Sequence, residues 1–176
     1  MPECPFCKIA KGEIPAAIVY DSKDVMAFLD IKPANPGHVL VITKGHYQIL
    51  PQMPEELNAA LLQVVKVIAH AQIEVLGAQG VEVLQRNGSV AGQLVPHVHV
   101  HVIPRFKDDK VVDTWETVDV KEDQLKEIQQ RLIEKAKEIA SGAEVKHVPK
   151  VTEALSKEPA KEKPKEKPVK LKQRHG

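Results

Sequence analysis

The sequence predicts an α+β fold in which a five-stranded antiparallel sheet packs against one long helix. Five short apolar runs, separated by turn-forming residues, have the length and composition of strands. One longer segment, residues 54–77, instead has apolar residues at helical spacing. The chain has 176 residues, 43% of them hydrophobic, which is enough to bury one ordinary core. We therefore expect a single folded domain.

The strands are expected in a regular order along the chain. Residues 18–20 and 24–29 flank Asp21-Ser22-Lys23 and predict a hairpin. The prolines and glycine of residues 32–37 predict a loop, because proline cannot continue a strand or helix interior. Three further strands are expected at residues 38–42, 81–84 and 97–105.

Two helices are expected. The helix at residues 54–77 begins with Pro54 and ends with Gly77, which is the usual asymmetry of helix termini. The second covers residues 120–140, with four apolar side chains on one side, namely Leu125, Ile128, Leu132 and Ile139. We expect residues 1–142 to form the domain, including this C-terminal helix.

The charge is distributed unevenly, although the formal net charge is only +1. From Ala143 onward there are ten Lys/Arg and five Asp/Glu, against fifteen and nineteen in residues 1–142. Lys-Glu-Lys-Pro repeats at 161–164 and 165–168 are too polar to pack. Residues 143–176 are therefore expected to form a disordered basic tail.

No apolar run approaches the roughly 18 residues that span a bilayer, and Met1-Pro2-Glu3-Cys4 does not resemble a signal peptide. We expect a cytoplasmic protein without a membrane partner. Its two cysteines, Cys4 and Cys7, form one CxxC, and in a reducing compartment metal binding is favoured over a structural disulfide. A closed zinc site needs two further ligands.

His97, His99 and His101 alternate with valines, so on a strand the three imidazoles would share one face. Imidazole is largely neutral at pH 7 and can act as nucleophile, proton donor or ligand. A glycine-rich loop at residues 86–93 precedes this strand and could bring backbone N–H groups to an anion. A two-histidine metal clamp and an edge strand with a polar face are the alternatives.

The motif His97-x-His99-x-His101-Val102-Ile103 resembles the signature of the histidine triad (HIT) superfamily of nucleotide hydrolases and transferases. Further matches run from Cys4 to about Arg105, at Phe6-Cys7-Lys8-Ile9, Gly12-Glu13-Ile14-Pro15, Ala27-Phe28-Leu29-Asp30-Ile31, Pro36-Gly37-His38 and Gly92-Gln93. The resemblance implies a HIT-like fold that pairs as a homodimer through the long helices and the sheets.

The resemblance also implies catalytic roles. His99 would attack the α-phosphorus of a nucleotide and form a covalent nucleotidyl-imidazole that water then hydrolyses. His101 would contact phosphate oxygens or the scissile bridge. His38 would lie behind them, either as a proton relay or as a buried structural histidine.

Nucleotide-binding residues follow from the same resemblance. Asp30 would bind the ribose hydroxyls, and an apolar pocket for the base would be formed by Phe6, Ile9, Phe28, Ile31 and Leu40. Backbone N–H groups of Gly92, Gln93 and Leu94, with the Gln93 amide, would bind phosphate. Two positions depart from the family pattern: Leu94 replaces the usual Ser or Thr, and Arg86 replaces the usual Asn or Gln.

Several family members bind a structural zinc, and here the matching ligands are Cys4, Cys7, His46 and His97. This Cys₂His₂ set has no open position, so the metal would stabilise the fold and perform no chemistry.

The third triad residue, His101, resembles that of the hydrolase branches, and no cysteine beyond Cys7 supplies the extra zinc finger of the DNA-deadenylating branch. Nucleic acid is therefore not an expected partner. The continuation through Trp115 into a terminal helix resembles the diadenosine polyphosphate hydrolases (Fhit-like).

We expect cleavage at the α-phosphorus of diadenosine polyphosphates or related purine nucleotide conjugates, which releases a nucleoside monophosphate. A polyphosphate substrate would bring magnesium with it. The alternatives are a purine nucleoside phosphoramidase (Hint-like), a nucleotide-binding regulatory protein with negligible turnover, and an interaction module acting through its tail.

Overall fold

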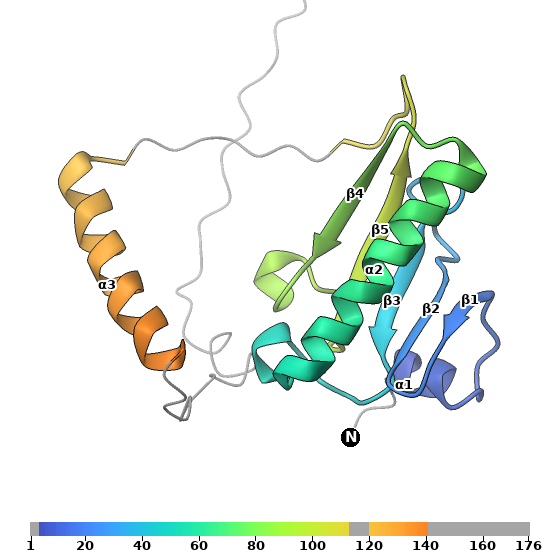
Figure 1. Ribbon diagram of the computed structural model, residues 1–176, viewed down its shortest axis with the longest axis horizontal. Coiled ribbons are helices and arrows are strands. Elements are labelled where there is room, and N and C mark those ends of the chain that lie inside the picture. Colours follow the sequence, from blue (N-terminus) through green and yellow to red (C-terminus); the bar gives the residue numbers. More distant parts are fainter. Residues whose placement is uncertain (1–3, 113–119, 141–176) are drawn as a thin grey trace, which may run out of the picture.

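The computed structural model describes residues 4–112 and 120–140 and confirms the α+β fold (Figure 1). Its strands form one antiparallel five-stranded sheet in the order β1-β2-β3-β5-β4. They are β1 (Ile18–Asp21), β2 (Val25–Leu29), β3 (Val39–Thr43), β4 (Gly80–Gln85) and β5 (His99–Arg105). The expected tail, residues 143–176, and Trp115 lie outside the described residues.

The histidine strand begins two residues later than expected. The N–H of Val98 donates to the carbonyl of Tyr47 over 2.7 Å, and the N–H of His97 donates to the carbonyl of Val95 over 2.8 Å. These bonds take both residues out of the ladder between β3 and β5, which starts at the pair of Ile42 with His99. His97 therefore precedes the strand that carries its two neighbours.

Helix α2 (Glu55–Leu76) matches the expected long helix, and Gly77 ends it in a left-handed conformation. Figure 1 shows α2 (green) lying across one face of the sheet. Its buried stripe contacts the sheet's inward valines in the larger core cluster. The packed side chains on α2 are Leu61, Val64, Val65 and Ile68.

By length and composition alone, α2 would suffice to cross a bilayer. Its stripe is instead packed on the sheet, and Gln72 donates from Nε2 to the carbonyls of Gly37 and Val102, each over 2.9 Å. Lys66 and His70 interrupt its outer surface. We therefore assign α2 to the core of the domain.

The opposite face of the sheet carries a second, smaller core cluster, covered by the short helix α1 (Pro5–Ala10). This cluster is formed by Phe6, Met26, Phe28, Leu40 and Ile42. The sequence patterns predicted no helix here, because six residues are too few for a periodic signal. The valines of β5 pack in the α2 cluster, and the rings of His97 and His99 contact Phe6 of α1 on the other face, as the alternation predicted.

Helix α3 (Glu122–Ala140) has the expected extent within two residues. Its apolar side chains are exposed, namely Leu125, Ile128, Leu132, Ile133 and Ile139. The apolar stripe that the sequence predicted therefore exists, but it is not buried against the described part of the domain.

Candidate functional site

His99 is buried and held in one tautomer by the backbone. Its Nδ1 lies 2.7 Å from the carbonyl oxygen of His97, and a carbonyl only accepts, so Nδ1 carries the proton. The other ring nitrogen, Nε2, then presents an unshared electron pair. Burial lowers the pKa of His99 below its ordinary value, so the ring is neutral at pH 7. The residue expected to be the nucleophile is thus in the form that a nucleophile needs.

His101 is the end of a chain of hydrogen bonds through His38. The N–H of Ala34 donates to His38 Nδ1 over 3.2 Å, which leaves the proton of a neutral His38 on Nε2. His38 Nε2 lies 3.0 Å from His101 Nδ1 and donates to it. His101 must then carry its own proton on Nε2. The chain orients a proton donor beside His99, whose ring centroid is 5.0 Å away.

Asp30 lies in the loop between β2 and β3, close to this pair. Its Oδ1 accepts from the N–H of Lys32 over 2.8 Å, and its Oδ2 lies 3.7 Å from His38 Nδ1, beyond hydrogen-bonding distance. Burial outweighs the Asp30 charge and lowers the pKa of His38. Asp30 is therefore at the site, with one carboxylate oxygen not fixed by the loop.

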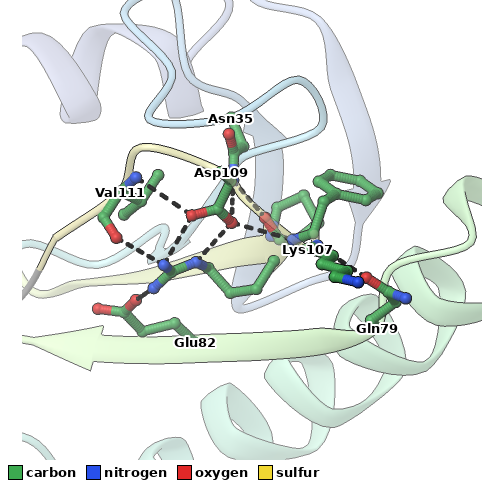
Figure 2. Close-up of polar contacts among 9 residues, drawn as sticks. Asn35, Gln79, Glu82, Lys107, Asp109 and Val111 are labelled. Atoms are coloured by element: carbon green, nitrogen blue, oxygen red, sulfur yellow. Dashed lines mark hydrogen bonds and ion pairs between the residues drawn. The ribbon is translucent and has the colours of Figure 1, made fainter.

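A polar cluster at the end of β5 contacts Asn35 in the loop between β2 and β3 (Figure 2). Arg105 pairs with Glu82 and Asp109, and Asp109 also accepts from Asn35 Nδ2 over 3.0 Å. Asn35 donates as well to the carbonyl of Pro104 over 2.9 Å. These carboxylates raise the pKa of Arg105, and Arg105 lowers that of Asp109. The cluster anchors the segment from which Ala34 orients His38.

Four of the five residues predicted to bind the base lie together. Phe6, Phe28 and Leu40 belong to the second core cluster, and Ile9 packs against it half-buried. The ring of Phe6 meets that of His99 edge to face, with centroids 5.1 Å apart. Ile31 is 91% exposed and does not belong to this cluster.

The glycine-rich loop is closed by hydrogen bonds of its own. The N–H of Gly92 donates to Ser89 and that of Gln93 to Gly88, over 2.9 and 3.1 Å. The Gln93 side chain is buried: its Oε1 accepts from Gly88 N–H over 2.7 Å, and its Nε2 donates to the carbonyl of Gln48 over 2.7 Å. Gly92 and Gln93 stay predicted phosphate donors, and in this structure their N–H groups and the Gln93 amide close the loop on itself. Leu94 is 92% exposed.

The four expected zinc ligands converge, with their ligand atoms within 4.8 Å of one another. Cys4 Sγ lies 3.4 Å from His97 Nδ1, Cys7 Sγ 3.3 Å from His46 Nδ1, and the two Nδ1 atoms are 3.2 Å apart. Tetrahedral zinc places neighbouring N and S ligands about 3.3 to 3.8 Å apart. The four side chains therefore fit the metal.

The surroundings of His97 support the same assignment. Its Nε2 lies 2.8 Å from the carbonyl of Thr43 and donates to it, so Nδ1 faces the thiols and His46 without a proton. Burial lowers the pKa of His97 to about 4, which keeps the ring in the form that binds metal. No sequence signal marked Thr43, because it contributes only a backbone oxygen.

The family model for the HIT domain matches residues 11–108, more than half of the chain. The chain belongs to the HIT family. An uncharacterized HIT-like protein of Methanocaldococcus jannaschii is 46% identical over 127 residues, which cover 71% of this chain and 98% of that protein.

Two further HIT relatives bear on the site. An adenosine 5'-monophosphoramidase of Schizosaccharomyces pombe is 35% identical over 135 residues, covering 76% of this chain and 98% of that protein. The crystal structure of a Zn-bound histidine triad family protein from Mycobacterium smegmatis matches with a TM-score of 0.60 and 34% identity. That match covers 75% of this chain and 96% of that one.

We expect the half-buried His101 to make the stability of this HIT protein depend on pH. Burial, followed by the charges of His99 and His38, lowers the pKa of His101 to about 4. The unfolded chain binds that proton near pH 6.5 and the folded protein does not. The contribution to the free energy of unfolding is therefore complete above pH 6.5 and is lost as the pH falls toward 4.

Urea unfolding at pH 7.5, 6.0 and 5.0 measures how steeply the free energy of unfolding falls with pH. His101→Asn is the matched variant. Asparagine retains a polar partner for His38 but does not titrate, so we expect a shallower loss of stability in acid. Zinc loss affects both proteins alike, so their difference isolates His101. A variant with an equal or steeper slope would contradict the assignment.

Proposed function

We propose that this HIT protein is a nucleotide hydrolase that cleaves at the α-phosphorus and releases a nucleoside monophosphate through a covalent adduct on His99. The observation that carries the proposal is that, on one face of the sheet, His99 has an unprotonated Nε2 and the neighbouring His101 has a protonated Nε2. His99 presents an unprotonated Nε2 because His97 binds its Nδ1 proton, and His101 presents a protonated Nε2 because His38 donates to its Nδ1. A nucleophile and a proton donor are thus prepared side by side.

The reaction proceeds in two displacements. His99 Nε2 forms a bond to the α-phosphorus while the bond to the leaving atom breaks, and that atom keeps the electron pair. Positive charge develops on the His99 ring, where the Nδ1 hydrogen bond to the His97 carbonyl stabilises it. A leaving atom that needs a proton takes it from His101 Nε2, which His38 supports.

Water then attacks the α-phosphorus and the bond to His99 breaks, which restores the neutral imidazole. The water proton passes to His101 where His101 has given up its own, and otherwise to solvent. In this proposal Asp30 binds the ribose, and the cluster around Phe6 receives the base. The cluster is adjacent to the nucleophile through the edge-to-face contact of Phe6 with His99.

We propose diadenosine polyphosphates as the preferred substrates, with magnesium arriving on the polyphosphate. Leu94 supplies no hydroxyl to assist an amine or alkoxide leaving group, which favours leaving groups that are already stable anions. A purine nucleoside phosphoramidase is the second candidate, and the name of the S. pombe relative favours it.

A side-by-side comparison of kcat/KM tests this preference. We expect higher values for diadenosine tri- and tetraphosphate than for an adenosine phosphoramidate, and we expect Leu94→Ser to gain on the phosphoramidate. A clear preference of the native protein for the phosphoramidate would support the second candidate instead. Binding without turnover of any of the three would favour a regulatory nucleotide-binding protein.

The assembly and setting of the protein are also proposed. Cys4, Cys7, His46 and His97 would hold a structural zinc that joins the segment before α1 to the residues preceding β5. We propose a homodimer formed through α2 and the edge strand β4, where exposed apolar residues are found at Leu62, Val67, Ile73, Val75 and Val83. We place this dimer in the cytoplasm.

A further inference from the structure

Arg86 follows the edge strand β4 and lies beside the nucleophile. In the ladder between β4 and β5, Leu84 pairs with His101 and Gln85 with Val100. The same register, extended one residue past the end of β4, places Arg86 across from His99. Directly opposed residues of an antiparallel pair share one face of the sheet. Arg86 is therefore the cross-strand neighbour of His99 on the triad face.

The Arg86 side chain lies against the glycine-rich loop. A Cβ built on Gly92 would be 3.4 Å from Arg86 Cδ and 3.5 Å from its Nε. Gly92 has a φ of +82°, which also favours glycine, so the loop admits the guanidinium at close range. The side chain is half-buried and packed rather than extended into solvent.

Among residues 4–112 and 120–140, no carboxylate forms an ion pair with Arg86. Arg105, by contrast, pairs with both Glu82 and Asp109. The Arg86 charge reaches the triad, since it contributes to lowering the pKa of His99 and of His101. A half-buried guanidinium without an acid partner is a preformed site for a phosphate-like anion, which it binds through paired N–H donors.

The glycine-rich loop itself carries no positive charge apart from that of the Arg86 side chain. The N–H groups of Gly92 and Gln93 and the Gln93 amide close the loop on itself, and Arg86 is the cation in the sequence of residues 86–94. Arg86 is therefore the residue of this segment that can neutralise charge on a substrate.

We propose that Arg86 selects substrates whose leaving group is an anion joined to the α-phosphorus through oxygen, such as a phosphate chain, over substrates that release a neutral amine. The inference rests on the proposed function and deepens it. The α-phosphate has the same charge in both substrate classes, so a cation distinguishes them through the leaving group. As the P–O bond breaks, the oxygen keeps the electron pair, and the guanidinium stabilises the charge that it gains.

The test compares the native protein with Arg86→Gln, which removes the charge and leaves a shorter side chain that still carries an N–H donor. Without magnesium, we expect the ratio of kcat/KM for diadenosine tetraphosphate to that for an adenosine phosphoramidate to fall about ten- to a hundredfold. Arg86→Lys should keep most of the ratio. Lys23→Gln, which removes an exposed charge from the turn between β1 and β2 at the other edge of the sheet, should leave it unchanged. Equal losses on both substrates, or no loss, would overturn the proposal.

A binding measurement separates this inference from the proposed function. ADP carries a phosphate where the leaving group departs and AMP does not, so calorimetry should show tighter binding of ADP, by about tenfold, only when Arg86 is present. A protein that shows this preference but turns over no substrate would refute the proposed function and retain the Arg86 site. If the native protein hydrolyses nucleotides, but the native protein and Arg86→Gln both bind ADP and AMP equally well, the proposed function stands and the Arg86 site is refuted.

Discussion

His99→Ala is expected to lower kcat by several orders of magnitude while changing nucleotide affinity by less than about tenfold. The reason is that different residues perform the reaction and bind the nucleotide. His99 supplies the electron pair that forms the bond to phosphorus, whereas Asp30 and the Phe6 cluster are proposed to supply most of the contacts to ribose and base. Removing the imidazole takes away the reaction step and leaves those contacts in place.

Single-turnover kinetics and calorimetry with AMP measure the two quantities separately. His70→Ala is the matched control, because His70 is exposed on α2, where its ring nitrogen contacts Glu74. It should retain full activity. Substantial turnover by His99→Ala would exclude the covalent route, and a parallel loss of binding and rate would show that the imidazole holds the ground-state nucleotide.

The double variant Cys4→Ser/Cys7→Ser is expected to lose one zinc ion per chain and to melt about 10 °C or more below the native protein. The unfolded chain has no preformed site, so metal binding contributes directly to the free energy of unfolding. The four ligands come from three separate segments, before and within α1, after β3, and before β5. Losing the metal therefore releases the amino terminus from the strand that carries the triad.

Elemental analysis of protein purified without chelator, followed by thermal melts, checks this result. Chelator treatment of the native protein should reproduce the melting temperature of the double variant, which serves as the internal control. Native protein without zinc, or a double variant that retains it, would contradict the Cys₂His₂ site and the place of His97 in it.

Periodicity accounts for most of what the sequence predicted about the fold. The valines at 98, 100 and 102 all pack in the core cluster shared with α2, and the helical spacing of residues 54–77 matches the stripe that α2 buries. These patterns repeat over many residues and reflect burial directly. Helix α1, with six residues, has no such repeat and was not predicted.

The parts of the site that could not be predicted depend on backbone atoms or on contacts between distant segments. The tautomer of His99 is set by the carbonyl of His97, and that of His38 by the N–H of Ala34. Neither group is visible in residue types. Gln93 was expected to face the substrate, but only the folded loop reveals that its amide bonds Gly88 and Gln48.

The sequence did not predict the Arg105 cluster for the same reason. Asn35 and Asp109 are far apart along the chain, and only the fold brings them within hydrogen-bonding distance. Arg86, in contrast, was visible as a departure from the family pattern. Its proposed role depends on the fold, which places it near His99 and forms no ion pair to it among the residues described.

The most direct test of the account is mass spectrometry of the protein quenched in acid-free denaturant during turnover of diadenosine tetraphosphate. We expect a nucleoside monophosphate adduct on the peptide that contains His99, absent from the His99→Ala variant and absent once substrate is exhausted. Rapid turnover without any adduct, or an adduct on another residue, would contradict the nucleophilic role of His99.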